Sequence, residues 1–255
     1  IPLEMIKSII RERQANSENV RQEISMQWAG RQNVSGPVLN VPVRITDITG
    51  NQKTYRKIYH VMPETLNING DVRTEKRHRS IYTAVVYGST LKLTGEFLVP
   101  EIEAEESGEI LWKEAYFTLG ISDNRGLRGG VAFNTGKNMV DALPGLRDQE
   151  VHDGGITFPY PLEGAGASIP FDIALDLSGS EDLSFTPAGK ITSVNLSSSW
   201  PAPGFNGKFL PVNRSISDKG FSSEWKVTNL NRNFPQLWTG SDFKPSADSF
   251  GVEFV

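Results

Sequence analysis

Residues 191–238 have the sequence ITSVNLSSSWPAPGFNGKFLPVNRSISDKGFSSEWKVTNLNRNFPQLW, and this stretch decides the fold. In Phe221–Val227 the large apolar side chains occur only at odd positions. Successive side chains of a β-strand point to opposite faces, so the segment is predicted to be a strand with one buried and one wet face. The alternation in Ile191–Trp200 predicts a second strand. Trp200 and Trp225 are expected to face a core, because a large ring buries much apolar area.

The rest of the chain after residue 36 repeats this pattern of short alternating segments and turns. Pro201–Gly204 is predicted to be a loop, because proline cannot donate to a β-ladder. Val41–Val61 predicts a hairpin with its turn at Thr49–Asn51. Ile169–Ser178 alternates cleanly between apolar and other side chains. Many strands without interposed helices predict a mainly β chain folded as a large antiparallel β-sandwich.

One weak internal sequence repeat leaves open whether this sandwich is a single unit or two related halves. LTGEFLVP at residues 93–100 resembles FNGKFLP at residues 205–211, as two related half-sandwiches would. The Pro/Gly-rich segment at residues 142–166 is the candidate boundary between such subdomains. The predicted domains are therefore a helix at residues 1–28 and a β-sandwich at residues 29–255.

The N-terminal helix is predicted from apolar spacing. Leu3, Ile6 and Ile10 lie at i, i+3 and i+7, which places them on one helix face. Either this face packs on the β domain, or the helix is a juxtamembrane segment that leaves a membrane helix, with Arg11 and Arg13 in the interface.

Composition excludes several classes of protein. The chain has 255 residues, no cysteine and a formal net charge of −4. The lack of cysteine excludes disulfides, thiolate zinc sites and cysteine nucleophiles. A negative net charge provides no basic field, so no nucleic-acid partner is expected. No run of about 18 apolar residues occurs, so no transmembrane helix is expected within this sequence.

The motifs of common enzyme and cofactor sites are absent from the sequence. It contains neither a Gly-x-Ser-x-Gly elbow nor a Gly-x-x-x-x-Gly-Lys-Ser/Thr loop. Gly164-Ala165-Gly166 lacks the third glycine of a dinucleotide fingerprint. We therefore predict that the chain is not an enzyme and holds no cofactor.

One group of residues has the composition of a metal site. Asp148, Glu150 and His152 occupy alternate positions, which would place their oxygen and imidazole ligands on one strand face. The glycines that follow favour a polar loop without a metal. His60 and His78 are far apart in sequence and indicate no shared site.

Two further groups are candidate interaction sites. Basic residues gather at Arg73, Lys76, Arg77 and Arg79, and could meet acidic lipid headgroups or a partner. The simpler interpretation is a solvated strand end, partly neutralised by Glu75.

Two carboxylates define the last candidate site. Asp172 and Asp176 lie on one face of a predicted strand. Paired carboxylates can hydrolyse glycosides when a cleft holds them at the right separation. Together with Trp200 and Trp225 they would form a site for cell-wall glycan, whereas two acids on an exposed strand are usually only solubilising.

Taken together, a set of short motifs resembles the CreD family of bacterial inner-membrane proteins. These motifs are Glu12-Arg13, Glu23-Ile24, Trp28, SGPVLNVPV at 35–43, PETL at 63–66, RSIY at 79–82, LSGS at 177–180, SWP at 199–201, FLP at 209–211, GFSSEW at 220–225, LNR at 230–232 and PQLW at 235–238. A glycine is common in the family where Ser80 stands here.

The resemblance implies a location and a phenotype. Such proteins have an N-terminal membrane helix, a large extracytoplasmic domain and further membrane helices, so this chain is expected to be the extracytoplasmic fragment, on the periplasmic face of the inner membrane. The family is associated with cell envelope integrity, colicin tolerance and control by the Cre two-component system. No catalytic residues are established for it, so the resemblance supplies none.

Three hypotheses about function follow. The leading one is a non-enzymatic module that binds an envelope component, protein or glycan, and is anchored through flanking membrane helices. The alternative is a domain that binds or processes cell-wall glycan. The third is a structural spacer without a ligand.

Overall fold

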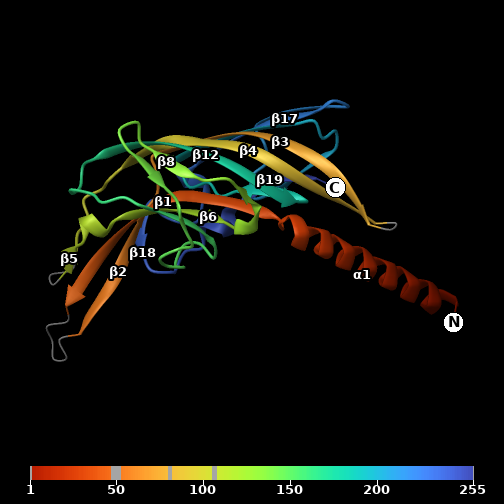
Figure 1. Cartoon of the computed structure of the whole chain (residues 1–255), viewed down its shortest axis with the longest axis horizontal. Helices are drawn as coiled ribbons and strands as arrows, with labels where there is room; N and C mark the ends of the chain where they lie inside the picture. The colour runs from red at the N-terminus through yellow and green to blue at the C-terminus, as the bar shows by residue number, and fades with distance from the viewer. Residues whose placement is uncertain (1, 47–52, 80–81, 105–107, 255) are drawn as a thin grey trace.

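The computed structural model describes residues 2–46, 53–79, 82–104 and 108–254 (Figure 1). It confirms the prediction of a mainly β chain with an N-terminal helix, α1 (Pro2–Trp28). The turn predicted at Thr49–Asn51 lies outside the described residues. The strands that flank it, β1 (Gln32–Thr46) and β2 (Thr54–Val61), pair antiparallel as the hairpin requires.

The strands form two sheets. Sheet A contains, in spatial order, β10 (Leu143–Pro144), β11 (Gly155–Pro159), β6 (Tyr116–Ile121), β1 (Gln32–Thr46), β13 (Asp182–Phe185), β19 (Phe250–Phe254) and β15 (Pro203–Gly207), with β2 (Thr54–Val61) and β5 (Gly108–Ile110) also on β1 and β18 (Leu237–Thr239) on β2. Sheet B contains β16 (Asn213–Ser217), β17 (Gly220–Thr228), β14 (Ile191–Ser198), β3 (Thr65–Arg79), β4 (Tyr82–Leu98), β12 (Ser168–Ser180), β8 (Ala132–Asn134) and β9 (Met139–Asp141), with β7 (Leu127–Arg128) beside β12. Short 3₁₀ helices are η1 (Trp112–Glu114), η2 (Asn124–Gly126), η3 (Asn229–Asn231) and η4 (Pro245–Asp248).

Both sheets are mixed rather than wholly antiparallel. β1 pairs parallel with β13, and β3 pairs parallel with β14. A parallel pair needs a long crossover connection. The chain between β3 and β14 provides one, because it passes through β4 and β12 of the same sheet and through strands of sheet A.

The core lies between the two sheets and is rich in aromatic rings. Phe117 of sheet A stacks on Phe133 of sheet B, with ring centroids 4.3 Å apart. Buried residues on both sides of the segment at 142–166 belong to this core, and the subdomain boundary there stays a prediction. The two segments with similar sequences lie in different sheets, at residues 93–98 in β4 and at residues 205–207 in β15.

The strands that decide the fold have the predicted faces. Val194 and Leu196 of β14 are buried, as are Phe221, Trp225 and Val227 of β17. The loop prediction is wrong in part, because β15 begins at Pro203. Proline is tolerated there because it is the first residue of a strand at the edge of sheet A.

Helix α1 projects away from the sheets (Figure 1). It is continuous through its polar middle. Leu3, Ile6 and Ile10 are exposed and do not pack on the β domain. The C-terminal end of α1 is attached to sheet B, because Trp28 Nε1 donates to the carbonyl oxygen of Tyr87 in β4 at 3.2 Å. Among the residues that the structure describes, no helix combines the length and the apolarity that a bilayer span requires.

Asp123 ties the segment after α1 to the sheets, and it should make stability depend on pH. Its Oδ2 accepts from the Gly30 N–H at 3.0 Å and from Arg125 Nη2 at 2.6 Å. The Arg125 hydrogen bond, together with the backbone N–H donors, lowers the pKa of Asp123 to about 2. Partial burial acts in the opposite direction and raises the pKa.

A carboxylate whose pKa is depressed by folding stabilises the folded state above its unfolded pKa. That stability is lost as pH falls through the folded pKa. We expect wild-type stability to fall between about pH 4 and pH 2, and Asp123→Asn to remove about 1–2 kcal/mol of this change after solvent screening. Urea unfolding at several pH values measures it, and equal slopes in both proteins would contradict it.

Candidate functional site

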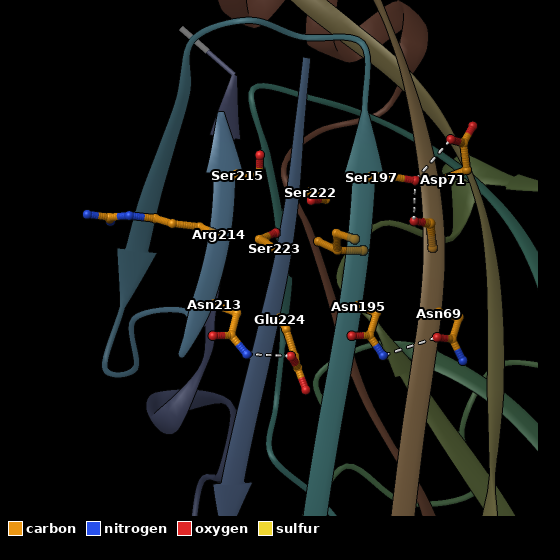
Figure 2. Close-up of a pocket in the computed structure, with 12 residues that line it drawn as sticks. Asn69, Asp71, Asn195, Ser197, Asn213, Arg214, Ser215, Ser222, Ser223 and Glu224 are labelled. Carbon is orange, nitrogen blue, oxygen red and sulfur yellow. Dashed lines mark hydrogen bonds between the residues drawn. The ribbon is translucent and has the colours of Figure 1, made fainter. Parts of the chain in front are cut away.

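The outer face of sheet B carries a groove lined mainly by polar residues, with a volume of about 720 Å³. It crosses four neighbouring strands, β3, β14, β17 and β16 (Figure 2). The polar lining of the groove follows from the alternation of side chains along these strands. Inward side chains such as Ile68, Leu196 and Trp225 fill the core, whereas the outward side chains are polar.

Strand register arranges these outward side chains in two rows across the four strands. One row is Asn69, Asn195, Glu224 and Asn213, and the other is Asp71, Ser197, Ser222 and Ser215. We call these eight residues the sheet B groove.

Hydrogen bonds join neighbours within each row. Asn195 Nδ2 donates to Asn69 Oδ1 at 3.2 Å, and Asn213 Nδ2 donates to Glu224 Oε2 at 2.8 Å. Ser197 Oγ donates to Asp71 Oδ2 at 3.2 Å. Figure 2 shows these contacts as a ladder, with the Arg214 side chain extending away from it. The groove thus presents amides, hydroxyls and two carboxylates, which can both donate to and accept from a polar ligand.

A second polar cluster lies on sheet A, beneath the segment at residues 145–153. His60 of β2 is fully buried, and its Nδ1 lies 2.8 Å from Asn40 Oδ1. Its Nε2 lies 2.9 Å from Glu150 Oε2. Burial lowers the pKa of His60, and the hydrogen bond to Glu150 opposes that effect. Asp148 accepts a hydrogen bond from the Tyr116 hydroxyl.

Comparison with known proteins identifies the family. A family model described as "Inner membrane protein CreD" matches residues 1–255. The chain belongs to the CreD family. A curated relative, "Inner membrane protein CreD" of Escherichia coli (strain K12), is 30% identical over 245 residues. The match covers 92% of this chain and 54% of that protein, so the chain spans about half the length of its curated CreD relative.

The basic residues singled out in the CreD-family sequence all lie on β3 but do not form one patch. Arg73 and Arg77 pair with the acids two positions before them, Asp71 at 3.5 Å and Glu75 at 2.9 Å. Lys76 has the opposite parity, and its Nζ lies 5.2 Å from the centroid of the Trp200 ring. The backbone of Arg79 belongs to β3, but its side chain lies outside the described part. An interaction surface here stays a prediction.

The predicted carboxylate pair also lies apart from the sheet B groove. Asp172 and Asp176 are on β12, and Asp172 pairs with Lys92 at 3.0 Å. Trp200 and Trp225 are buried, with exposed fractions of 8% and 0%, which confirms that they face the core. The structure therefore does not bring these four residues together on one accessible surface.

The candidate metal trio Asp148, Glu150 and His152 is brought together only in part. Asp148 and Glu150 do converge with a histidine, but that residue is His60, whereas His152 is buried beside Gly120. The three predicted residues do not share a strand face, because the segment at 145–153 is irregular. Alternation could not reveal His60, since its contact with residues 148 and 150 depends on how this segment crosses sheet A.

The sheet B groove was missed by sequence reasoning, although the sequence contains part of its signal. The outward positions of the two predicted strands, at residues 191–200 and 221–227, hold Asn195, Ser197, Ser222 and Glu224, which supply half of the two rows. The other half comes from strands whose register the sequence does not reveal.

Proposed function

We propose that this CreD-family chain is a non-enzymatic binding module on the periplasmic face of the inner membrane, and that the sheet B groove binds a glycan of the cell envelope. The observation that carries the proposal is the pair of polar rows across four strands. By holding an envelope glycan close to the membrane, the module would contribute to cell envelope integrity. In this proposal, two-component control determines when the module is produced. Colicin tolerance then depends on where the module is present in the envelope.

The chemistry of the groove supports a polyhydroxylated ligand. Each sugar hydroxyl both donates and accepts, and so do the amides and hydroxyls of Asn195, Asn213 and Ser215. The two rows repeat across the strands, which suits a chain of similar units. The outward side chains of the rows offer no aromatic or large aliphatic anchor of the kind that dominates protein–protein affinity.

Helix α1 supports the location near a membrane. Its apolar side chains Leu3, Ile6 and Ile10 are exposed in a helix that projects from the sheets. Such a surface is unfavourable in water and is stabilised by contact with lipid or with other membrane segments. In this proposal α1 is the juxtamembrane segment that joins the module to membrane helices outside this sequence.

The glycan-processing alternative is less well supported. It requires Asp172 and Asp176 to act together in a cleft beside aromatic rings. Asp172 instead pairs with Lys92, and both tryptophans are in the core. Both carboxylates lie on β12, which β4 separates from the sheet B groove.

Calorimetric titration with soluble peptidoglycan fragments tests the proposal. The variants Asn195→Ala and Glu224→Ala remove one polar group each from the middle of the groove. We expect each to weaken binding about tenfold, as the loss of a hydrogen bond of about 1.4 kcal/mol would. Asp141→Asn removes an exposed carboxylate on β9, at the opposite edge of sheet B, and is the matched control that should bind as the wild type does.

Each other outcome favours a different function. Cleaved fragments that disappear in Asp176→Asn would support the glycan-processing alternative and sink the non-enzymatic proposal. A wild type that binds none of the fragments would favour the spacer.

A further inference from the structure

Three side chains from two distant segments converge on sheet A. His60 of β2 and the carboxylates of Asp148 and Glu150 each offer one ligand atom, and these atoms all lie within 4.8 Å of one another. His60 is fully buried and both carboxylates are partly exposed. The three residues therefore form a cluster in which the buried imidazole nitrogen meets two carboxylates that are partly exposed.

Asn40 determines which nitrogen of His60 carries hydrogen. Its Nδ2 donates to Thr118 Oγ1 at 3.0 Å and to the Val38 carbonyl oxygen at 3.2 Å, so Oδ1 must face the imidazole. An amide oxygen only accepts, so His60 Nδ1 is the N–H that donates to it at 2.8 Å. In the neutral ring the lone pair is then on Nε2, which points at the carboxylates.

This arrangement creates an electrostatic requirement. Nε2 with its lone pair lies 2.9 Å from Glu150 Oε2, which is also an acceptor when ionised. Two acceptors at this distance need a proton or a cation between them. A metal ion satisfies the requirement and also engages the nearby oxygen of Asp148.

The surroundings have the hydrogen bonds that orient metal ligands in known sites. A ligating histidine commonly donates its other N–H to an oxygen, as His60 does to Asn40. A ligating carboxylate is in turn hydrogen-bonded, as Asp148 is by the Tyr116 hydroxyl and by the Glu150 N–H at 3.1 Å. The Trp238 ring, with its centroid 5.4 Å from that of His60, restrains the imidazole on one side.

We propose that His60, Asp148 and Glu150 bind one divalent transition-metal ion, with Zn²⁺ as the best match. Imidazole suits Zn²⁺ better than Mg²⁺ or Ca²⁺, and carboxylate oxygens complete its usual ligand set. To bind Zn²⁺, the partly exposed carboxylates would have to place an oxygen about 2.0–2.2 Å from the ion. The ion would fasten the segment at residues 145–153 to β2. This inference does not depend on the sheet B groove.

Titration of the tag-free chain with Zn²⁺ in a calorimeter tests the site. We expect one Zn²⁺ per chain, and a weakening of at least about tenfold in Glu150→Gln and in Asp148→Asn. Both variants keep the size of the side chain, and circular dichroism verifies their fold. Thermal unfolding is a second measurement, because an ion that binds only the folded state raises Tm in the wild type more than in the variants.

Two matched controls separate this site from adventitious binding. Asp153→Asn removes an exposed carboxylate of the same segment, and His78→Ala removes an exposed histidine elsewhere. Both should bind Zn²⁺ within about twofold of the wild type. The proposal is overturned if the wild type fails to bind Zn²⁺, if Glu150→Gln and Asp148→Asn bind as the wild type does, or if a control loses as much affinity as they do. A stronger response to Mg²⁺ or Ca²⁺ would overturn the choice of a transition metal.

Discussion

Replacing Trp225 with alanine is expected to lower the free energy of unfolding by about 3–5 kcal/mol. The indole is fully buried on the inner face of sheet B. It packs across the core against Phe250 and Phe205 of sheet A, with ring centroids 5.7 Å away in each case. Its Nε1 donates to the Phe209 carbonyl oxygen at 3.1 Å. The alanine variant loses the packing and the hydrogen bond together and leaves a cavity between the sheets.

Trp225→Phe separates these contributions. The phenyl ring keeps much of the packing but cannot donate to Phe209, so we expect a smaller loss of about 1–2 kcal/mol. Urea unfolding followed by far-ultraviolet circular dichroism is the measurement, because it does not depend on the removed fluorophore. If Trp225→Ala lowered the free energy of unfolding by less than about 1 kcal/mol, the result would contradict the placement of Trp225 in the core. The ring would then be a candidate ligand contact.

Trp225 also illustrates what the sequence could predict. A strand has a period of two, so the identity of its neighbours in sequence is enough to assign Trp225 to one face with Phe221 and Val227. The volume of the ring then makes the buried face the favourable one. Local periodicity therefore predicted long strands such as β14 and β17, their core side chains and the N-terminal helix without any knowledge of strand order.

Pairing between distant strands could not be predicted in this way. The parallel contact of β3 with β14 depends on a crossover through other strands, and no residue in either strand signals it. The sheet B groove exists only because this contact places Asn69 beside Asn195 and Asp71 beside Ser197. His60 meets Glu150 for the same reason, since the contact joins β2 to an irregular segment far along the chain. Both sites are properties of register and loop path, which local sequence patterns do not determine.

Gly95→Ala should be at least as damaging as Trp225→Ala, with an expected loss of about 4 kcal/mol or more. Gly95 lies on the inward parity of β4, between β3 and β12. A Cβ there would stand 1.9 Å from the Thr65 carbonyl oxygen and 2.7 Å from Phe171 Cζ. The oxygen belongs to the backbone and the phenyl ring is buried, so relief requires β3 and β4 to separate. A glycine inside a strand often marks such a close approach.

Gly88→Ala is the matched control for that substitution, because Gly88 lies on the same strand and a Cβ there would meet no atom within 4 Å. Both variants add one methyl group and both remove the conformational freedom of a glycine. The control is therefore expected to change stability by no more than about 0.5 kcal/mol. A comparison of the two urea midpoints isolates the steric contribution, since the effect on the unfolded chain is shared. Equal midpoints would show that β3 and β4 are not held as closely at Thr65 as the structure has them. The parallel pairing of β3 with β14, and with it the sheet B groove, relies on that placement of β3.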